Sequence, residues 1–167
     1  MSFNASIKVI LASEGGFVDD PTDPGGATNM GITIGTLSAE RGDHCTVADV
    51  KALTQAEAVR IYQANYWNPA HCGDLPGGVD LMVFDAAVNS GVGRAIRLLQ
   101  RAVGVDDDGA FGPATKAAVA ARTPKAVIDA YHDAHAAFYE GLPTFWKYGK
   151  GWLARNDRTR SIAQGMT

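Results

Sequence analysis

The sequence has few of the features that identify membrane proteins, disulfide-rich proteins or nucleotide-dependent enzymes. Its 167 residues contain no run of 18 or more apolar side chains, which excludes a membrane-spanning helix. The two cysteines, Cys45 and Cys72, are too few for a disulfide scaffold, and we expect reduced thiols. No phosphate-binding loop, dinucleotide-binding glycine pattern or nucleophile motif occurs in the chain. The start of the chain lacks the basic segment and cleavage site of a secretory leader, so we expect no Sec-dependent export.

Basic residues are scarce in the first half of the chain and acidic residues are fewer in the second. Residues 1–93 carry 4 basic and 11 acidic side chains, a net charge of −7, whereas residues 94–167 carry 11 basic and 7 acidic ones, a net charge of +4. No dense Lys/Arg run or nucleic-acid-binding signature is present, so nucleic acid is not an expected partner. The second half either meets an anionic partner or is a solvated helical surface.

The composition is that of a globular protein, with 46% hydrophobic and 20% charged residues. The length fits one domain with at most two small lobes. The best boundary lies near residues 91–94, where glycines coincide with the change in charge sign. Because no flexible linker separates the halves, we expect two lobes that share a core.

The pattern of apolar and turn-forming residues predicts a mainly α-helical fold with one small β-hairpin near the N-terminus. Apolar residues at helical spacing predict a helix over residues 3–14. Asp-Pro and Gly-Gly pairs before a β-prone run predict an irregular hairpin over residues 17–34. Further helices are expected over residues 79–90, 94–103, 114–121, 125–140 and 151–163.

Two helix starts between these elements are marked by capping boxes, in which a threonine and an acidic residue satisfy the free N–H groups of the first turn. Thr46 with Asp49 forms a short one, and Thr54 with Glu57 forms the better one. We therefore expect a helix that opens at Thr54 and runs through Tyr66.

Glu14 is the residue that most suggests catalysis. It falls on the apolar stripe of the first predicted helix, directly before the two glycines that end it. A carboxyl group on an apolar face loses hydration of its charged form, which raises its pKa and suits it to donate a proton near neutral pH. A glycosidase needs such an acid and a second polar or carboxylate group across the scissile bond. The hairpin offers Asp20, Asp23, Thr28 and Asn29, of which Asp23 and Thr28 are favoured, although each alone also fits a structural role in a turn.

The segment EGGFVDDPTDPGGATNMGIT at residues 14–33 begins with a Glu-Gly-Gly-aromatic signature. Three further segments follow it, namely YWNP at 66–69, LPGGVD at 75–80 and VFDAAVNSG at 83–91. With these segments the chain resembles glycoside hydrolase family 108, the N-acetylmuramidase-like proteins of phages and Gram-negative bacteria. The later segments DGAFGPAT at 108–115 and GWLAR at 151–155 resemble the predicted peptidoglycan-binding domain of that family.

The resemblance implies a lysozyme-like, two-lobed helical fold. Residues 1–93 would form the catalytic lobe, and residues 94–167 a helical, peptidoglycan-binding lobe packed on the first. The catalytic glutamate of the family falls on Glu14. The Glu, Asp and Thr arrangement of phage-type lysozymes places the partners at Asp23 and Thr28. Because the hairpin differs in length from that pattern, Asp20 is the alternative to Asp23.

Asp85 and Asn89 lie four residues apart in an apolar helix and therefore share one face. A buried polar pair needs partners, so these side chains either line the sugar cleft or anchor the hairpin from behind. The candidate substrate-binding residues are Asp20, Asn29, Tyr66, Asp85 and Asn89. Aromatic residues such as Tyr148 and Trp152 either stack on saccharide rings or belong to the core, and the core is favoured for Trp152.

Metal-ligating side chains stand side by side in two pairs, His44-Cys45 and His71-Cys72. Structural zinc motifs space their ligands by two or more residues, so we expect no metal site. Glycoside hydrolysis by carboxyl groups needs no cofactor, and we expect none.

By this resemblance the chain is expected to be a lysozyme that cleaves the β-1,4 bond between N-acetylmuramic acid and N-acetylglucosamine, with Glu14 as general acid. Two alternatives stay open: a non-catalytic peptidoglycan-binding protein, and a lytic transglycosylase that uses the same glutamate. The expected partner is bacterial peptidoglycan, bound by a monomer without membrane insertion. We expect synthesis in the cytoplasm and action in the periplasm or cell wall after holin-type or other non-Sec release.

Overall fold

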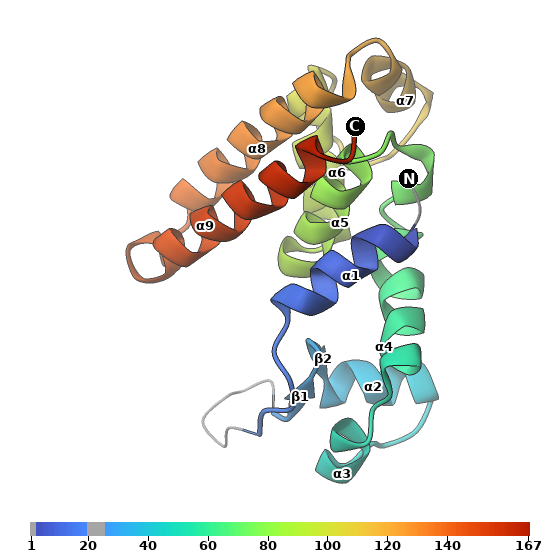
Figure 1. The fold of residues 1–167 in the computed structure, drawn as a ribbon. Coiled ribbons are helices and arrows are strands. Elements are labelled where there is room, and N and C mark those ends of the chain that lie inside the picture. Colours follow the sequence, from blue (N-terminus) through green and yellow to red (C-terminus); the bar gives the residue numbers. More distant parts are fainter. Residues whose placement is uncertain (1–2, 20–25) are drawn as a thin grey trace. The chain divides into compact units, whose positions relative to one another are not determined.

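The computed structural model describes residues 3–19 and 26–167, which form two compact units (Figure 1). The first unit comprises Asn4–Asn65, and the second comprises Phe3 with Tyr66–Thr167. Across the described residues the chain forms α-helices α1 to α9 and a single two-stranded sheet. The prediction of a mainly α-helical fold with one small hairpin is confirmed. No helix in the described ranges is long and apolar enough to cross a membrane.

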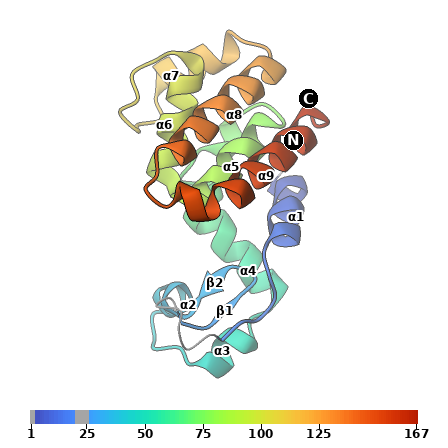
Figure 2. The same cartoon turned by 90° about the vertical axis from the view of Figure 1, so that its left-hand side faces the viewer.

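The first unit folds around the hairpin. Its elements are α1 (Phe3–Ser13), β1 (Thr28–Asn29), β2 (Ile32–Thr33), α2 (Ile34–Arg41), α3 (Val47–Lys51) and α4 (Gln55–Tyr62). The strands pair antiparallel, with Thr28 opposite Thr33, and α2 and α3 lie beside the sheet (Figure 2). The β-prone run stops at Thr33 because the Thr33 hydroxyl accepts the Thr36 N–H and caps α2.

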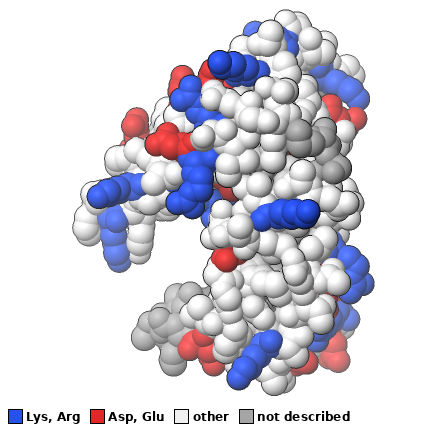
Figure 3. All heavy atoms as spheres, viewed as in Figure 1, with Lys and Arg blue, Asp and Glu red and all other residues white. Residues whose placement is uncertain are grey.

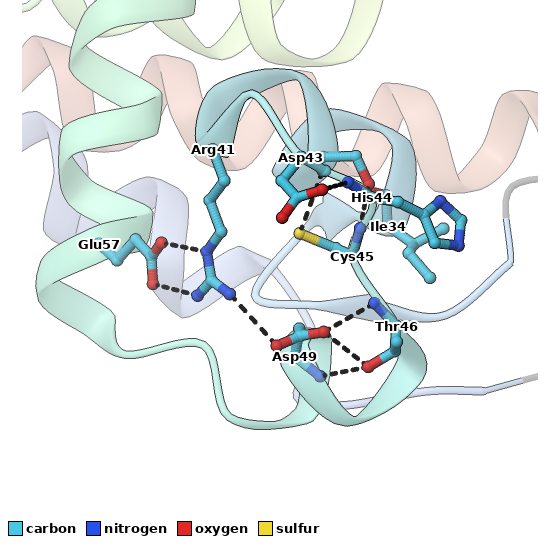
Figure 4. Close-up of polar contacts among 9 residues, drawn as sticks. Ile34, Arg41, Asp43, His44, Cys45, Thr46, Asp49 and Glu57 are labelled. Atoms are coloured by element: carbon cyan, nitrogen blue, oxygen red, sulfur yellow. Dashed lines mark hydrogen bonds and ion pairs between the residues drawn. The ribbon is translucent and has the colours of Figure 1, made fainter.

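The better capping box of this unit is Thr46 with Asp49, so the prediction that favoured Thr54 with Glu57 is wrong. Thr46 and Asp49 satisfy each other's backbone N–H groups at the start of α3. Thr54 caps α4, but the Glu57 carboxylate turns instead to Arg41, whose Nε and Nη2 each donate to it at 2.9 Å. This hydrogen bonding lowers the pKa of Glu57. Because Arg41 also reaches Asp49 at 3.4 Å, it ties α2 to both α3 and α4 (Figure 4).

The second unit is a helical bundle built around α5. The π-helical turn η1 (Gln63–Trp67) continues α4 and crosses the boundary between the units after Asn65. The other elements of the second unit are the short 3-10 turn η2 (Cys72–Asp74), α5 (Val79–Ser90), α6 (Val92–Val103), α7 (Pro113–Ala120), α8 (Pro124–Glu140) and α9 (Phe145–Gln164). Residues 79–87 of α5 are all buried, since α6, α8 and α9 pack around it. The near-continuous apolar run of this segment therefore reflects a helix covered on all sides. Helix α5 precedes residue 94, yet it packs against α6, which spans that residue, and against α8 and α9, which follow it.

The helices of this unit lie close to their predicted ranges except for α9, which begins six residues before the predicted start at residue 151. Gly149 and Gly151 weaken the local helix signal in this stretch. The structure compensates at Gly149, where the Phe145 ring packs so closely on the backbone that a Cβ atom would overlap it. Because these residues lie one turn apart in the same helix, a side-chain contact within α9 offsets the weak helix propensity of this stretch.

Candidate active site

Glu14 lies at the C-terminal end of α1, where the helix stops. Its N–H donates to the Ile10 carbonyl at 3.1 Å, so the residue continues the last helical turn. Ile7 and Ile10 on the same stripe are buried, and Glu14 itself is half-buried. The sequence pattern thus predicted the placement of this carboxylate at the edge of an apolar helix face.

The hairpin turn is formed by Met30 and Gly31, which have positive φ angles of 49° and 74°. Positive φ at both central residues of a two-residue loop is the geometry of a type I′ turn, which matches the twist of the paired strands. The conformation is unfavourable for methionine. It is held by Tyr62 at the end of α4, whose hydroxyl donates to the Met30 carbonyl at 2.9 Å.

Gly31 brings Glu14 and Tyr62 together. A Cβ atom on Gly31 would lie 2.9 Å from Glu14 Oε2 and would overlap the Tyr62 hydroxyl. Only glycine allows both side chains to reach the turn so closely. The Glu14 carboxylate and the Tyr62 hydroxyl therefore both border the hairpin turn at Gly31. Sequence reasoning missed Tyr62 and Gly31 as site residues, although Gly31 lies within the hairpin that was predicted over residues 17–34.

Thr28 and Asn29 both lie in β1 and serve the hairpin in the described structure. The backbone of Thr28 exchanges two hydrogen bonds of 2.8 Å with Val18. Asn29 is buried, and its amide donates to the Val50 carbonyl at 3.0 Å, which anchors the hairpin on α3. Asp20 and Asp23 lie outside the described residues. The chemical roles assigned to these four side chains stay predictions.

The other three candidates belong to the second unit. Asp85 is buried, and its Oδ1 accepts from Arg155 Nε at 3.0 Å and Nη2 at 2.9 Å. Asn89 is exposed and donates to the Asp85 carbonyl at 2.7 Å. Tyr66 is half-buried in η1. The partner of Asp85 is thus Arg155, a residue that sequence reasoning did not select.

The two His-Cys pairs belong to different units. Cys45 and Cys72 are buried free thiols, and burial raises the pKa of Cys72. His71 stacks on Phe111, with ring centroids 4.7 Å apart. Within residues 3–19 and 26–167, no three His, Cys, Asp or Glu side chains are arranged to hold a metal ion.

Comparison with known proteins identifies two segments of the chain that match family models. Residues 7–91 match the model of glycosyl hydrolase 108, and residues 94–157 match a predicted peptidoglycan domain. The structure of Brucella abortus SagA is 48% identical, with a TM-score of 0.88, covering 98% of this chain and 94% of that one. No curated protein matches the sequence.

The resemblance predicted from the sequence is confirmed, with the two segments in the predicted order. The compact units do not coincide with them, since the units divide after Asn65 and the family segments near residues 91–94. A glycoside hydrolase segment followed by a peptidoglycan domain makes the protein a peptidoglycan hydrolase. The chain belongs to the glycosyl hydrolase 108 family.

Proposed function

We propose that this peptidoglycan hydrolase is an N-acetylmuramidase that cleaves the β-1,4 bond between N-acetylmuramic acid and N-acetylglucosamine, with Glu14 as its general acid. The observation that carries the proposal is the position of the Glu14 carboxylate at the end of α1, 2.9 Å from the site of a Gly31 Cβ. A carboxyl group confined by a turn and an aromatic residue has few available rotamers, and catalysis requires such positioning.

In the proposed reaction the bond between the anomeric carbon and the bridging oxygen breaks. Glu14 gives its proton to that oxygen, which leaves as the hydroxyl of N-acetylglucosamine. Water supplies the hydroxyl group that the anomeric carbon of N-acetylmuramic acid gains. The transition state carries positive charge on the sugar ring, which a second carboxylate stabilises while it or a neighbour orients the water. We assign this second role to Asp23, assisted by Thr28, with Asp20 as the alternative carboxylate.

Glu14→Gln tests the acid directly, because glutamine keeps the size of the side chain but has no proton to give. We expect lysis of purified peptidoglycan to fall by at least about 100-fold while the melting temperature stays close to that of the wild type. Glu40→Gln is the matched control, since Glu40 is an exposed acid of the same unit that accepts from Asn65. A folded Glu14→Gln protein with wild-type lysis would remove Glu14 from the mechanism.

Asp23→Asn and Asp20→Asn distinguish the two candidate carboxylates. Each change keeps an oxygen that accepts hydrogen bonds in a turn and removes the negative charge. We expect Asp23→Asn to lower lysis with little change in melting temperature, and to lower it more than Asp20→Asn does. The reverse result would assign the second carboxylate to Asp20.

A further inference from the structure

The second unit contains a recess of about 200 Å³ between the C-terminal ends of α5 and α8 and the middle of α9. It is lined by Asn89, Ser90, Phe138, Tyr139, Leu142, Trp152 and Arg155. Pockets for drug-sized ligands usually exceed about 300 Å³, so this recess suits a single small ring better than a long ligand.

One wall of the recess continues into an aromatic surface. The Tyr139 and Trp152 rings stack with centroids 5.2 Å apart, and Trp152 and Tyr148 follow at 5.7 Å. Tyr148, Trp152 and Arg155 are spaced by four and three residues, so they share one flank of α9. Tyr148 is 46% exposed, which leaves its ring available beside the opening.

The polar side chains that line the recess have a net charge of zero when Asp85, the partner of Arg155, is included. Arg155 is paired with the buried Asp85 carboxylate, and this pair is electrically neutral. Asn89 contributes an exposed amide, and Ser90 and Tyr139 contribute hydroxyl groups. Aromatic rings with amide and hydroxyl groups suit an uncharged ligand that has both an apolar face and hydrogen-bonding substituents.

Lys147 places a positive charge at the rim. Its ammonium lies 4.9 Å from the centroid of the Tyr148 ring. Of the other two basic residues between 138 and 155, Arg155 is paired with Asp85, and Lys150 lies about 200° around α9 from Tyr148. Figure 3 shows Lys and Arg side chains, with Asp and Glu side chains among them, over α8 and α9 on the face in view. This charge complements the carboxylates of peptidoglycan peptides.

We propose that this recess binds an N-acetylhexosamine ring of a peptidoglycan glycan strand, with Trp152 and Tyr148 against the ring face and Asn89 at the acetamido group. Lys147 then faces the carboxylates of the attached peptide. The proposal deepens the proposed function, because it rests on peptidoglycan as substrate and names where the second unit holds it. It does not depend on the catalytic role of Glu14.

Binding of the Glu14→Gln protein to insoluble purified peptidoglycan, measured by cosedimentation, tests the recess separately from cleavage. In this background we expect Tyr148→Ala to weaken binding about fivefold and Trp152→Ala about tenfold, the effects of losing one and two aromatic contacts. If Trp152→Ala fails to fold, the exposed Tyr148 decides the result alone. Retained lysis by Glu14→Gln would refute the acid assignment but not the recess, whose binding would then be measured over times too short for lysis.

Trp146→Ala is the matched control for the aromatic residues. Trp146 is 84% exposed, but it precedes Tyr148 by two residues and so lies about 200° around α9, on the opposite flank. We expect no loss of binding from this variant. Equal losses for Trp146→Ala and Tyr148→Ala would overturn the proposal, as would wild-type binding by a folded Tyr148→Ala protein.

Two further comparisons separate sugar recognition from charge. Lys147→Ala should weaken binding at low salt more than Lys150→Ala, since both remove one charge and Lys150 shares the flank of Trp146. An uncharged N-acetylglucosamine tetramer should compete with peptidoglycan for the parent protein. Competition by free peptidoglycan peptides alone, without competition by the tetramer, would overturn the assignment to a sugar.

Discussion

Gly31→Ala should destabilise the protein and impair catalysis through the same contact. The new Cβ would lie 2.9 Å from Glu14 Oε2 and overlap the Tyr62 hydroxyl. The φ angle of 74° disfavours an L-residue by about 1–2 kcal/mol. Displacing Tyr62 also disturbs its hydrogen bond to Met30, worth about 1 kcal/mol. We expect the free energy of unfolding to fall by about 2–3 kcal/mol.

The catalytic effect follows from the position of the carboxylate. To relieve the contact with the new Cβ, the Glu14 side chain has to move away from the turn. A displacement of about 1 Å in a catalytic group lowers rates by about 100-fold. Urea unfolding measures the stability of the variant, and the release of fragments from peptidoglycan at matched folded concentration measures its activity.

Tyr62→Phe provides the test of the reasoning, because it removes the hydroxyl that the new methyl group meets. In that background Gly31→Ala should retain the backbone strain but lose the overlap with Tyr62, so its cost should be smaller by about 1 kcal/mol. Equal costs in both backgrounds would refute the claim that Tyr62 packs against Gly31. Unchanged lysis by Gly31→Ala would refute the claim that the turn positions Glu14.

Three further changes test other parts of the structure. Burial lowers the pKa of His135 to about 4 from 6.5. Between pH 6.5 and about 4, the His135 imidazole is therefore protonated in the unfolded chain but not in the folded one. Stability should therefore fall by on the order of 3 kcal/mol as the pH drops through that window, and His135→Phe should remove this part of the dependence in urea unfolding at several pH values. Arg155→Met removes the guanidinium that neutralises buried Asp85 and should lower the free energy of unfolding by about 3 kcal/mol, with a smaller loss in an Asp85→Asn background. Asn29→Ala should lower it by about 1–2 kcal/mol, and an unchanged urea midpoint would contradict its anchoring role.

Local patterns predicted most of the helices because their apolar spacing and end signals agree. Helix α5 occupies the predicted residues 79–90, and Thr54 caps α4 as expected. The failures occur where a side-chain contact overrides the local propensity. The Phe145 ring packs on Gly149 one turn further along α9 and offsets the low helix propensity of glycine there. Arg41, 16 residues earlier in the chain, draws Glu57 away from its capping position, and this partner is not identifiable from the local spacing.

The candidate site was predictable to a similar extent. Glu14 stood out because a carboxylate on an apolar stripe is unusual, and its neighbours Gly15 and Gly16 indicated a helix end. Tyr62 contacts a turn 32 residues earlier in the chain, and Arg155 binds an aspartate 70 residues earlier. Contacts of this separation depend on the tertiary fold, which composition and periodicity do not specify.

The masses of fragments released from purified peptidoglycan, after reduction with borohydride, test the central claim most directly. Hydrolysis of the bond between N-acetylmuramic acid and N-acetylglucosamine adds one water and leaves a reducible N-acetylmuramic acid end. We predict these ends for the wild-type protein and their absence for Glu14→Gln. Anhydro ends, which lack that water and resist reduction, would identify a transglycosylase and contradict the account, as would reduced N-acetylglucosamine ends.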